Sequence, residues 1–585
     1  MFVVLKKLSW FFRENWQRYL IAITLLILVG VLDVIPPKLI GMAIDDIHVG
    51  GISKKKIIQY LGILLGIMVS SYAITYVWMY RLFGGAFLVE RKLRSRFVNH
   101  LLKMTPVFYE KNRTGDLMAR ATNDLKAISI TAGFGILTLV DSSVWMLTLL
   151  VTMGSFISWK LTLAAIIPLP FMAILMKIYG NRIHTRFMEA QDAFGELNDR
   201  VLESVAGVRV IRAYVQEEAD SNRFHQLTED VYDKNIKVAR IDALFDPTIK
   251  VLVGISYLIG LGYGAYLVFH QSITLGNLVS FNVYLGMLIW PMFAIGELIN
   301  VMQRGNASLD RVNETLSYVE EVVNPLHPIL IERADGIDYQ HVIFRYPSSK
   351  NDNLKDVNVK VIPGQTLGIV GKTGSGKTTF IKQLLRQYPL GNGEVSISGV
   401  PLEEQTLNQV RNWIGYVPQD HVLFSRSVKE NILFGRKDAN DQELDEVIDL
   451  AALRMDIDLL PEGLSTLVGE KGVALSGGQK QRISIARALI KNPDILILDD
   501  SLSAVDAKTE KRIIDNIRKV RNDKTTIITT HRMSAVQHAD HIIVLEEGRI
   551  IEEGTHEMLL NHDGWYKEQF IRQQSAGKIE EGVQA

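Results

Sequence analysis

One short segment of the chain has the residue types and spacing that hold phosphate. Residues 371–379 read Gly-Lys-Thr-Gly-Ser-Gly-Lys-Thr-Thr and follow the apolar, strand-like run Thr366–Val370. Because glycine has no Cβ, the backbone N–H groups of such a loop can converge on a β-phosphate. Lys377 can reach the β- and γ-phosphate oxygens, and the Thr378 hydroxyl can ligate Mg²⁺. The pattern is a P-loop, and it predicts a nucleotide site made of Gly371, Lys372, Thr373, Gly374, Ser375, Gly376, Lys377, Thr378 and Thr379.

A second segment is suited to an anion for a different reason. Residues 475–479 read Leu-Ser-Gly-Gly-Gln and open the helix-like stretch 481–489. A helix N-terminus presents free N–H groups and the positive end of the helix dipole. The sequence therefore predicts a second nucleotide contact, at Ser476, Gly477, Gly478 and Gln479.

Three further motifs complete a recognisable order along the chain. Gln419 lies in Tyr-Val-Pro-Gln-Asp, Asp499 ends the apolar run 495–498, and His531 follows the run 526–530. With the two segments above and Ser-Ala-Val-Asp at residues 503–506, these motifs resemble the P-loop, Q-loop, signature, Walker B, D-loop and H-loop of the ABC ATPase nucleotide-binding domain. The chain is accordingly identified as similar to that α/β P-loop family.

The resemblance implies roles for individual residues. Asp499 would hold Mg²⁺ together with Thr378 and Gln419, and Gln419 would also sense the γ-phosphate region. His531 would orient the γ-phosphate. Tyr346, in Phe-Arg-Tyr-Pro at 344–347, stands where the family stacks the adenine ring. Without the other motifs, an ordinary surface tyrosine would be the less favoured alternative for Tyr346.

The residue after the Walker B aspartate departs from the family pattern. It is Asp500, whereas nucleotide-driven transporters usually carry glutamate there to orient the attacking water. The aspartate carboxylate is one methylene shorter, and a misplacement of about 1 Å can cost on the order of a hundredfold in rate. We therefore predict three catalytic residues, Asp500, His531 and Gln419, in a site that binds ATP well and cleaves it slowly.

The chain combines this altered residue with an intact signature, and the combination indicates how the protein assembles. In the family, each nucleotide lies between the P-loop of one ATPase domain and the signature of another, so a single chain cannot complete a site. The resemblance thus implies a heterodimer, in which this chain's signature completes a competent site on a second half-transporter. A homodimer with slow but adequate aspartate catalysis is the alternative.

The rest of the chain must position this machinery, and its composition indicates a membrane protein. The chain has 585 residues, a net charge of zero and 48% hydrophobic residues, too many residues for one core. A bilayer core requires about 20 apolar residues of a helix. Six stretches approach that length, and they lie near 17–44, 57–80, 130–157, 160–179, 247–270 and 277–300.

Topology follows from the even number of spans and from charge. Both termini share one side, which must be the cytosol because ATP is there. Lys and Arg are frequent in 81–126 and 177–250 and absent from 270–276, as expected for inner segments and an outer turn. Lys54, Lys55 and Lys56 disagree, and we interpret them as a solvated outer loop. The first apolar stretch is read as a retained helix and not as a cleaved signal, since no small-residue cleavage site follows.

The expected domain order is an α-helical transmembrane domain followed by the ATPase domain. We predict a transmembrane domain at 1–305, a linker at 306–335, a nucleotide-binding domain at 336–575 and a C-terminal tail at 576–585. The segments after spans two and four are long and suit cytosolic helical extensions. From about residue 10 to 575 the chain resembles exporters of the multidrug type, which implies docking helices near 108–117 and 212–217.

Acidic and aromatic residues in or near the spans are candidates for contact with a cargo. Helical spacing places Trp290, Phe293 and Glu297 on one face and Asp141 and Trp145 on another. Intramembrane carboxylates usually face a cavity or a partner, and aromatic and acidic faces suit amphipathic cations. Helix packing with a local ion pair is an equally valid interpretation. The candidate cavity set is Asp33, Asp141, Trp145, Trp290, Phe293 and Glu297.

Two functions remain open at this stage. The first is an ATP-driven exporter subunit in the cell membrane, with ATP and Mg²⁺ as cofactors and with lipids, a second half-transporter and an amphipathic small molecule as partners. The second is a homodimeric lipid flippase or lipid exporter, or a regulatory ATP-clamp subunit of a membrane assembly. The spans argue against a nucleic-acid partner, and the absence of cysteine removes thiol chemistry and disulfides.

Overall fold

The computed structural model describes residues 3–469 and 473–583, and the chain divides into two compact units. The first unit comprises Met1–His100 and Gly115–Tyr318, and the second comprises Leu101–Thr114 and Val319–Ala585. The predicted order of a helical domain followed by an α/β domain is confirmed. A short segment near residue 108 nevertheless belongs to the second unit, although it lies between two spans in the sequence.

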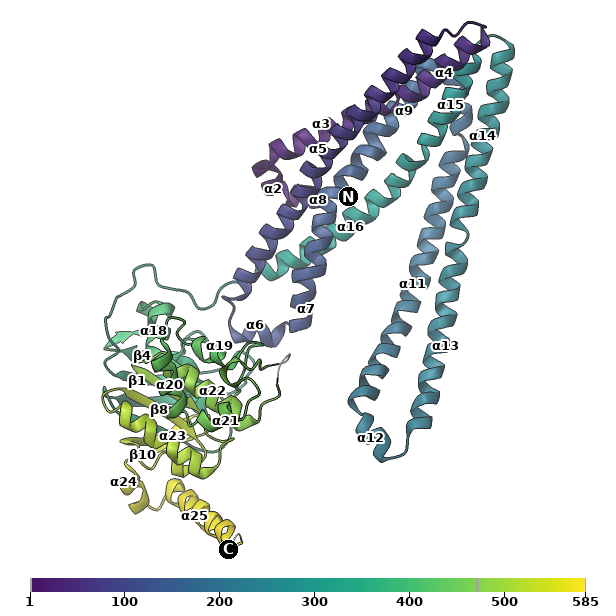
Figure 1. Ribbon diagram of the computed structural model, residues 1–585. Helices are drawn as coiled ribbons and strands as arrows, with labels where there is room; N and C mark the ends of the chain where they lie inside the picture. Colours follow the sequence, from purple (N-terminus) through teal and green to yellow (C-terminus); the bar gives the residue numbers. More distant parts are fainter. Residues whose placement is uncertain (1–2, 470–472, 584–585) are drawn as a thin grey trace. The chain divides into compact units, whose positions relative to one another are not determined.

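The first unit is built of helices, several of them long (Figure 1). In chain order they are α1 (Val3–Lys7), α2 (Ser9–Glu14), α3 (Trp16–Asp33), α4 (Ile35–His48), α5 (Lys54–Leu101), α7 (Thr114–Ala119), α8 (Leu125–Val140), α9 (Met146–Met153), α10 (Trp159–Ile166), α11 (Pro168–Ala206), α12 (Val208–Ala213), α13 (Glu217–Asp242), α14 (Phe245–Phe269), α15 (Leu275–Met287) and α16 (Ile289–Leu316). Short π-helical turns, η1 (Arg120–Asp124), η2 (Asp141–Trp145) and η3 (Gly154–Ser158), join α7 to α10.

Among the described residues, five helical stretches are long and apolar enough to cross a membrane, one fewer than the six predicted spans. They are Trp16–His48, Lys54–Leu101, Thr114–Ala206, Glu217–Phe269 and Leu275–Leu316. The difference arises because Thr114–Ala206 contains both 130–157 and 160–179. At 1.5 Å per residue it would be about 140 Å long, several times the thickness of a bilayer core. The backbone of Ser158 is extended (φ −168°, ψ 124°), and its side chain caps α10, so a break separates the two predicted spans.

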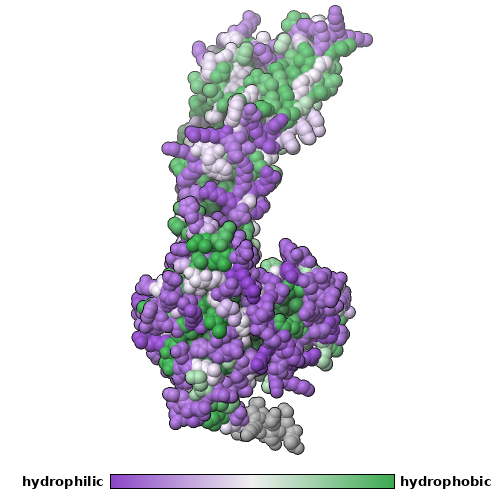
Figure 2. All heavy atoms as spheres, turned by 90° about the vertical axis from the view of Figure 1, so that its left-hand side faces the viewer, coloured by the Kyte–Doolittle hydropathy of each residue, from purple (hydrophilic) through white to green (hydrophobic). Residues whose placement is uncertain are grey.

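The surface of this unit suits a lipid environment. Large apolar side chains are exposed along α5, for example Leu61, Leu65 and Met68. Figure 2 shows hydrophobic side chains gathered on the helices near the top of the view. A water-soluble protein would bury such a surface, because apolar area in water is costly.

The second unit holds two sheets. One is antiparallel, with strands in the order β2 (Leu354–Val361), β1 (Ile337–Phe344), β4 (Asn392–Ile397) and β5 (Val400–Pro401). The other has the order β10 (Arg549–Gly554), β9 (His541–Glu546), β3 (Thr366–Val370), β8 (Thr525–Thr530), β7 (Ile495–Asp499) and β6 (Ile414–Val417). Strands β9, β3, β8, β7 and β6 run parallel, so their carboxyl ends meet at one edge of the sheet.

The second unit also contains α-helices. They are α6 (Pro106–Lys111), α17 (Lys377–Leu384), α18 (Leu407–Trp413), α19 (Val428–Leu433), α20 (Asp441–Leu450), α21 (Arg454–Asp458), α22 (Gly477–Leu489), α23 (Ala507–Val520), α24 (His556–Asn561) and α25 (Trp565–Val583). The central strands β7 and β8 are buried at every position, as parallel strands covered on both faces should be.

Some predicted boundaries differ from the structure. Helix α16 continues to Leu316, inside the range predicted as linker, because apolar side chains such as Leu309 and Val312 are still buried on one face of its otherwise polar C-terminal part. Helix α25 runs to Val583, through most of the predicted tail, and residues 584–585 lie outside the described residues. The predicted docking segment near 108–117 is divided between α6 and α7, and the segment near 212–217 overlaps the end of α12.

Candidate nucleotide site

The predicted P-loop connects β3 to α17 at the carboxyl edge of the parallel sheet. Gly374 (φ 83°) and Gly376 (φ 109°) adopt the left-handed conformations that glycine alone accepts without strain. A Cβ at Gly371 would lie 2.2 Å from the carbonyl oxygen of Leu545. The hydroxyl of Ser375 is buried and has no hydrogen-bond partner among the described residues. A buried, unpaired hydroxyl in a glycine cradle fits an incoming phosphate oxygen.

Lys377 lies folded into this loop. Its Nζ donates to the carbonyl oxygens of Gly371 at 2.8 Å and Lys372 at 2.9 Å. Burial lowers the pKa of Lys377, while Asp500 and Asp499 act in the opposite direction. A bound triphosphate would supply the negative charge that this half-buried ammonium lacks. Lys372, by contrast, forms a surface salt bridge with Glu546 at 2.9 Å.

The predicted metal ligands are brought together only in part. The Thr378 hydroxyl donates to Asp499 Oδ1 at 3.1 Å, and Asp499 is 1% exposed. Gln419 is exposed and makes no side-chain hydrogen bond among the described residues. One hydroxyl, one carboxylate and an adjoining phosphate cradle fit Mg²⁺, which usually keeps several water ligands and binds through one or two carboxylates and phosphates.

Asp500 and His531 face each other. His531 Nδ1 and Asp500 Oδ1 are 3.0 Å apart. The backbone of Asp500 is left-handed (φ 46°), and its N–H donates to the carbonyl oxygen of Thr529 at 2.9 Å. An aspartate held in this conformation, between a strand and the D-loop, is fixed from both sides. Its carboxylate position is therefore set by the backbone and has little freedom to compensate for its short side chain.

Tyr346 lies beside the P-loop helix. Its hydroxyl donates to Thr379 Oγ1 at 3.1 Å, and its ring packs edge-on against Tyr388 with centroids 5.0 Å apart. Burial raises the pKa of Tyr346, and the hydrogen bond to Thr379 opposes that effect. The hydroxyl stays protonated, so it anchors the ring next to the loop predicted to hold the phosphates.

The signature segment caps α22. Ser476 is the N-cap residue: its hydroxyl accepts from the Gln479 N–H at 3.3 Å, and the Gln479 side chain accepts from the Ser476 N–H at 2.9 Å. Ser476 and Gly477 are exposed. Within the described part of the chain, no hydrogen bond joins the signature residues to the P-loop. The two predicted phosphate contacts are thus separate in this chain.

Three residues of this edge were not predicted as site residues. Thr529 donates to Asp499 Oδ1 at 2.6 Å, and the Tyr416 hydroxyl donates to Asp499 Oδ2 at 3.3 Å. Arg532, the residue after His531, donates to the carbonyl oxygens of Val505 and Ser503 and so holds the D-loop. Strand β8 reads Thr-Thr-Ile-Ile-Thr-Thr, so nothing in the sequence distinguishes Thr529 from the other threonines of the strand.

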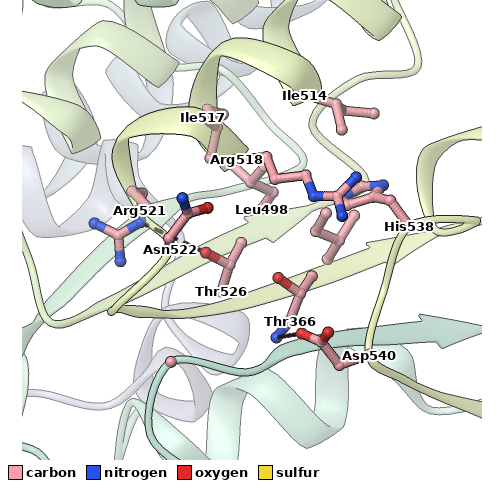
Figure 3. A pocket seen from close by; sticks show the side chains of 12 residues that line it. Thr366, Leu498, Ile514, Ile517, Arg518, Arg521, Asn522, Thr526, His538 and Asp540 are labelled. Carbon is pink, nitrogen blue, oxygen red and sulfur yellow. Dashed lines mark hydrogen bonds between the residues drawn. The ribbon is translucent and has the colours of Figure 1, made fainter.

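A cavity of about 280 Å³ lies elsewhere on the same sheet. Figure 3 shows the side chains that line it. It is lined from the amino ends of the strands by Thr366, Thr526 and Asp540, and from α23 by Arg518. The P-loop, Asp499 and His531 stand at the opposite, carboxyl ends of these strands. This cavity is therefore not the nucleotide site.

Among the candidate cargo residues, one pair is joined by a hydrogen bond, between Trp290 and Asp141. Trp290 Nε1 donates to Asp141 Oδ2 at 2.9 Å, and Asp141 begins the π-helical turn η2. Such turns often occur at functional sites. Asp33 is paired with Ser71 at 3.5 Å, the limit of a hydrogen bond. Trp145 packs against α3 at Gly30. Phe293 is exposed, and Glu297 makes no hydrogen bond or salt bridge among the described residues.

Fold and site together define an ABC-type ATPase joined to a helical membrane region. The family description "ABC transporter transmembrane region" matches residues 19–292, and "ABC transporter" matches residues 354–503. The chain belongs to the ABC transporter family. This confirms the resemblance that the sequence motifs carried.

Individual relatives cover nearly the whole chain. The chain is 64% identical over 574 residues to the "Probable multidrug resistance ABC transporter ATP-binding/permease protein YheI" of Bacillus subtilis (strain 168), covering 98% of each protein. It is 42% identical over 575 residues to the "Multidrug resistance-like ATP-binding protein MdlA" of Escherichia coli (strain K12), covering 98% of this chain and 97% of that protein. A solved structure of a bacterial Atm1-family ABC exporter with ATP bound matches with a TM-score of 0.77 and 26% identity, over 95% of this chain and 99% of the other.

Family membership fixes the broad activity. The chain is a multi-pass protein of the cell membrane whose ATPase domain binds ATP and couples its hydrolysis to transport. Members of the family act as dimers in the membrane.

Proposed function

We propose that this chain is the ATP-retaining half of a heterodimeric exporter that moves amphipathic small molecules out of the cytosol. The observation that carries the proposal is the pairing of Asp500, in place of the usual glutamate, with a complete signature helix in the same chain. A P-loop site that hydrolyses ATP slowly, in a chain whose signature helix is complete, fits a dimer with two unequal nucleotide sites.

In this proposal the chain's own P-loop site binds Mg·ATP tightly. Residues 371–379 hold the phosphates, Tyr346 stacks on adenine, and Thr378, Gln419 and Asp499 hold Mg²⁺. Mg²⁺, when bound, neutralises phosphate charge. Asp500 and His531 lie beside the γ-phosphate position, but the short Asp500 side chain fails to bring a water into line, so this nucleotide persists through many cycles.

The partner's nucleotide is completed by this chain. The exposed N-terminus of α22 offers its free N–H groups and the Ser476 hydroxyl to a γ-phosphate held by the partner's P-loop. A partner that keeps glutamate after its Walker B aspartate then performs most of the hydrolysis. Closure of the two ATPase domains on ATP opens the membrane helices outward, and hydrolysis resets them.

The cargo class is inferred from the membrane helices and from relatives. Asp141 bonded to Trp290 joins an acidic and an aromatic group on neighbouring helices, an arrangement that recognises a cationic, aromatic molecule by charge and stacking. Proteins named for multidrug resistance are 64% and 42% identical to this chain. The charge distribution of the loops supports cytosolic termini and a cytosolic ATPase domain.

The proposal is tested by ATP turnover in lipid. The chain is purified alone and also together with half-transporters from the same cell that carry glutamate at the position of Asp500. We expect little phosphate release from the lone chain and a rate that rises with the glutamate-bearing partner and again with cationic drugs. Brisk turnover by the lone chain would support a homodimer, and a response to lipid without a response to drugs would support lipid transport or a regulatory role.

A further inference from the structure

The segment that contains helix α6 is attached to the rest of the ATPase unit by apolar packing and by polar contacts, of which the first two lie just before the helix. Val107 is 3% exposed and belongs to the apolar cluster that includes Tyr388 and Phe380. The Thr105 hydroxyl donates to Glu321 at 2.7 Å, and Lys103 forms a salt bridge with Glu320 at 3.0 Å. In the sequence, α6 lies between two candidate membrane spans, Lys54–Leu101 and Thr114–Ala206, and is joined to each by a short non-helical segment.

Tyr388 connects α6 to the neighbourhood of the nucleotide site. It is 2% exposed, and its hydroxyl donates to Glu110 Oε1 at 3.4 Å. Burial raises the pKa of Tyr388, and the Glu110 carboxylate raises it further, so the phenol remains a proton donor. On its other side, the Tyr388 ring packs against Tyr346 at 76°, with centroids 5.0 Å apart.

Tyr346 in turn contacts the P-loop helix. Its hydroxyl donates to Thr379 Oγ1 at 3.1 Å, one residue after the predicted Mg²⁺ ligand Thr378. The ammonium of Lys382 lies 5.6 Å from the Tyr346 ring centroid and 5.7 Å from that of Tyr388, so one cation interacts with both rings. An unbroken series of contacts thus runs from Thr379 through Tyr346 and Tyr388 to Glu110.

We propose that Tyr388 is a positioning residue that transmits occupancy of this chain's nucleotide site to α6 through Glu110. The inference rests on the proposed adenine contact of Tyr346. An adenine ring stacked on Tyr346 fixes the angle of that ring, and the edge-on packing passes the constraint to Tyr388. The Tyr388 hydroxyl then holds Glu110, and with it α6, in one orientation.

The geometry favours a transmitting role over simple packing. A hydroxyl needed only for burial would bond to a backbone carbonyl in the core, as Tyr339 does with Phe380 at 3.0 Å. Tyr388 directs its hydroxyl to an exposed carboxylate on a separate helix, over a distance long enough to shorten when the rings are ordered. A site that hydrolyses ATP slowly and stays occupied would keep this connection engaged for most of the cycle.

The test uses Tyr388→Phe, which removes only the hydroxyl. Tyr566→Phe is the matched control, because Tyr566 is also buried and its hydroxyl bonds to His556 at 2.7 Å in a different cluster. Both variants are studied in the active dimer in lipid, with ATP affinity, ATP hydrolysis and drug transport measured on the same samples. For Tyr388→Phe we expect ATP affinity within about twofold of the parent and transport per ATP lowered by about fivefold or more.

A structural readout accompanies the transport measurement. Because this chain has no cysteine, Arg113→Cys and Lys360→Cys place two spin labels at exposed positions near α6 and on β2 without other labelling of this chain. In the parent, Mg·ATP should narrow the distance distribution between the labels, and in Tyr388→Phe that narrowing should be lost. Adding Glu110→Ala to Tyr388→Phe should cause no further loss, because both act on one hydrogen bond.

Two results would overturn the inference. One is transport per ATP and label distances in Tyr388→Phe that match those of Tyr566→Phe. The other is a full additional loss when Glu110→Ala is combined with Tyr388→Phe. Tyr346→Ala separates this inference from the proposed nucleotide contact: unchanged ATP affinity in that variant removes the adenine assignment, whereas the Tyr388→Phe result still reports on the connection between Thr379 and α6.

Discussion

Two helix N-termini in the ATPase unit are suited to phosphate, and they are prepared in different ways. Helix α17 begins after Gly376 without a side-chain cap, so its first N–H groups are free, and Lys377 and Asp499 lie beside them. Helix α22 begins at Ser476 with a complete capping box and is exposed. Among the described residues, α22 has no phosphate cradle of this chain next to it. The first end has a phosphate cradle of this chain beside it, whereas the second, in the proposed dimer, serves a nucleotide held by another chain.

The comparison also locates the departure from the family pattern. Asp500 belongs to the α17 side, where its conformation is fixed by Thr529 and its carboxylate faces His531. The capping box of α22 shows no corresponding change. The capping box of α22 is complete although the usual glutamate is replaced by Asp500, and this difference between the two ends supports the proposal that the partner's site performs most of the hydrolysis.

The largest effect is expected on the α22 side. Gly477→Asp places a carboxylate where the partner's γ-phosphate should meet the helix, and repulsion replaces attraction. We expect ATP turnover of the dimer to fall by about a hundredfold or more, as when a phosphate or oxyanion contact is lost in other enzymes. The rate of phosphate release in lipid measures it.

Gly477→Ala is the control for that change. A Cβ at Gly477 would have the Cβ of Ala504 as its nearest neighbour at 3.6 Å, an ordinary contact, so the fold should accept it. Turnover close to normal in Gly477→Asp would show that α22 does not face a nucleotide. The comparison of α17 and α22 as two phosphate-binding helix ends would then be wrong.

On the α17 side, Asp500→Glu should raise the rate of ATP hydrolysis at this chain's own P-loop site. The added methylene brings the carboxylate about 1 Å closer to the attacking water, which should raise hydrolysis at this site by about 10- to 100-fold. The measurement is hydrolysis by the dimer after the partner's glutamate has been changed to glutamine, so that only this site contributes. An unchanged rate would mean that the backbone at Asp500, and not the side-chain length, limits the reaction.

The local sequence was sufficient to predict features that depend on the conformation of one short segment. Glycine spacing defines the P-loop, and serine with glutamine three residues later defines the cap of α22, since both depend only on nearby atoms. The same holds for the helical membrane region, because apolar length reports directly on burial in lipid. These features of the fold and of the nucleotide site could therefore be predicted without coordinates.

Contacts between distant segments could not be predicted in this way. Neither the bond from Tyr388 to Glu110 nor that from Thr529 to Asp499 leaves a pattern in sequence, because each depends on how strands and helices pack. Hydropathy also fails to mark where a helix ends in water, so α16 continues beyond its predicted boundary to Leu316. The break at Ser158 depends on one backbone conformation within a long apolar stretch.

A smaller effect should separate binding from hydrolysis on the α17 side. Tyr346→Ala removes the ring proposed to stack on adenine, and we expect affinity to fall about tenfold, or about 1.4 kcal/mol, within the range for loss of one base-stacking aromatic. Binding of a fluorescent ATP analogue to the chain measures this. Tyr232→Ala, at an exposed tyrosine of α13, should leave affinity unchanged. Equal affinities for the two variants would place adenine elsewhere.

The smallest effect is expected for Asp500→Asn, and it tests the comparison most directly. Asparagine keeps the size of the side chain and an oxygen that can face His531, but it cannot accept a proton from water. If the partner performs the hydrolysis, turnover of the dimer should stay within about twofold of the parent, whereas removal of a working general base costs about 10²- to 10⁴-fold. Steady-state phosphate release decides between these values. Gly477→Asp and Asp500→Asn lie on the same chain, so the ratio of their effects on turnover measures the share of hydrolysis that the partner's site performs. Two equally large losses of turnover would instead indicate two identical sites in a homodimer.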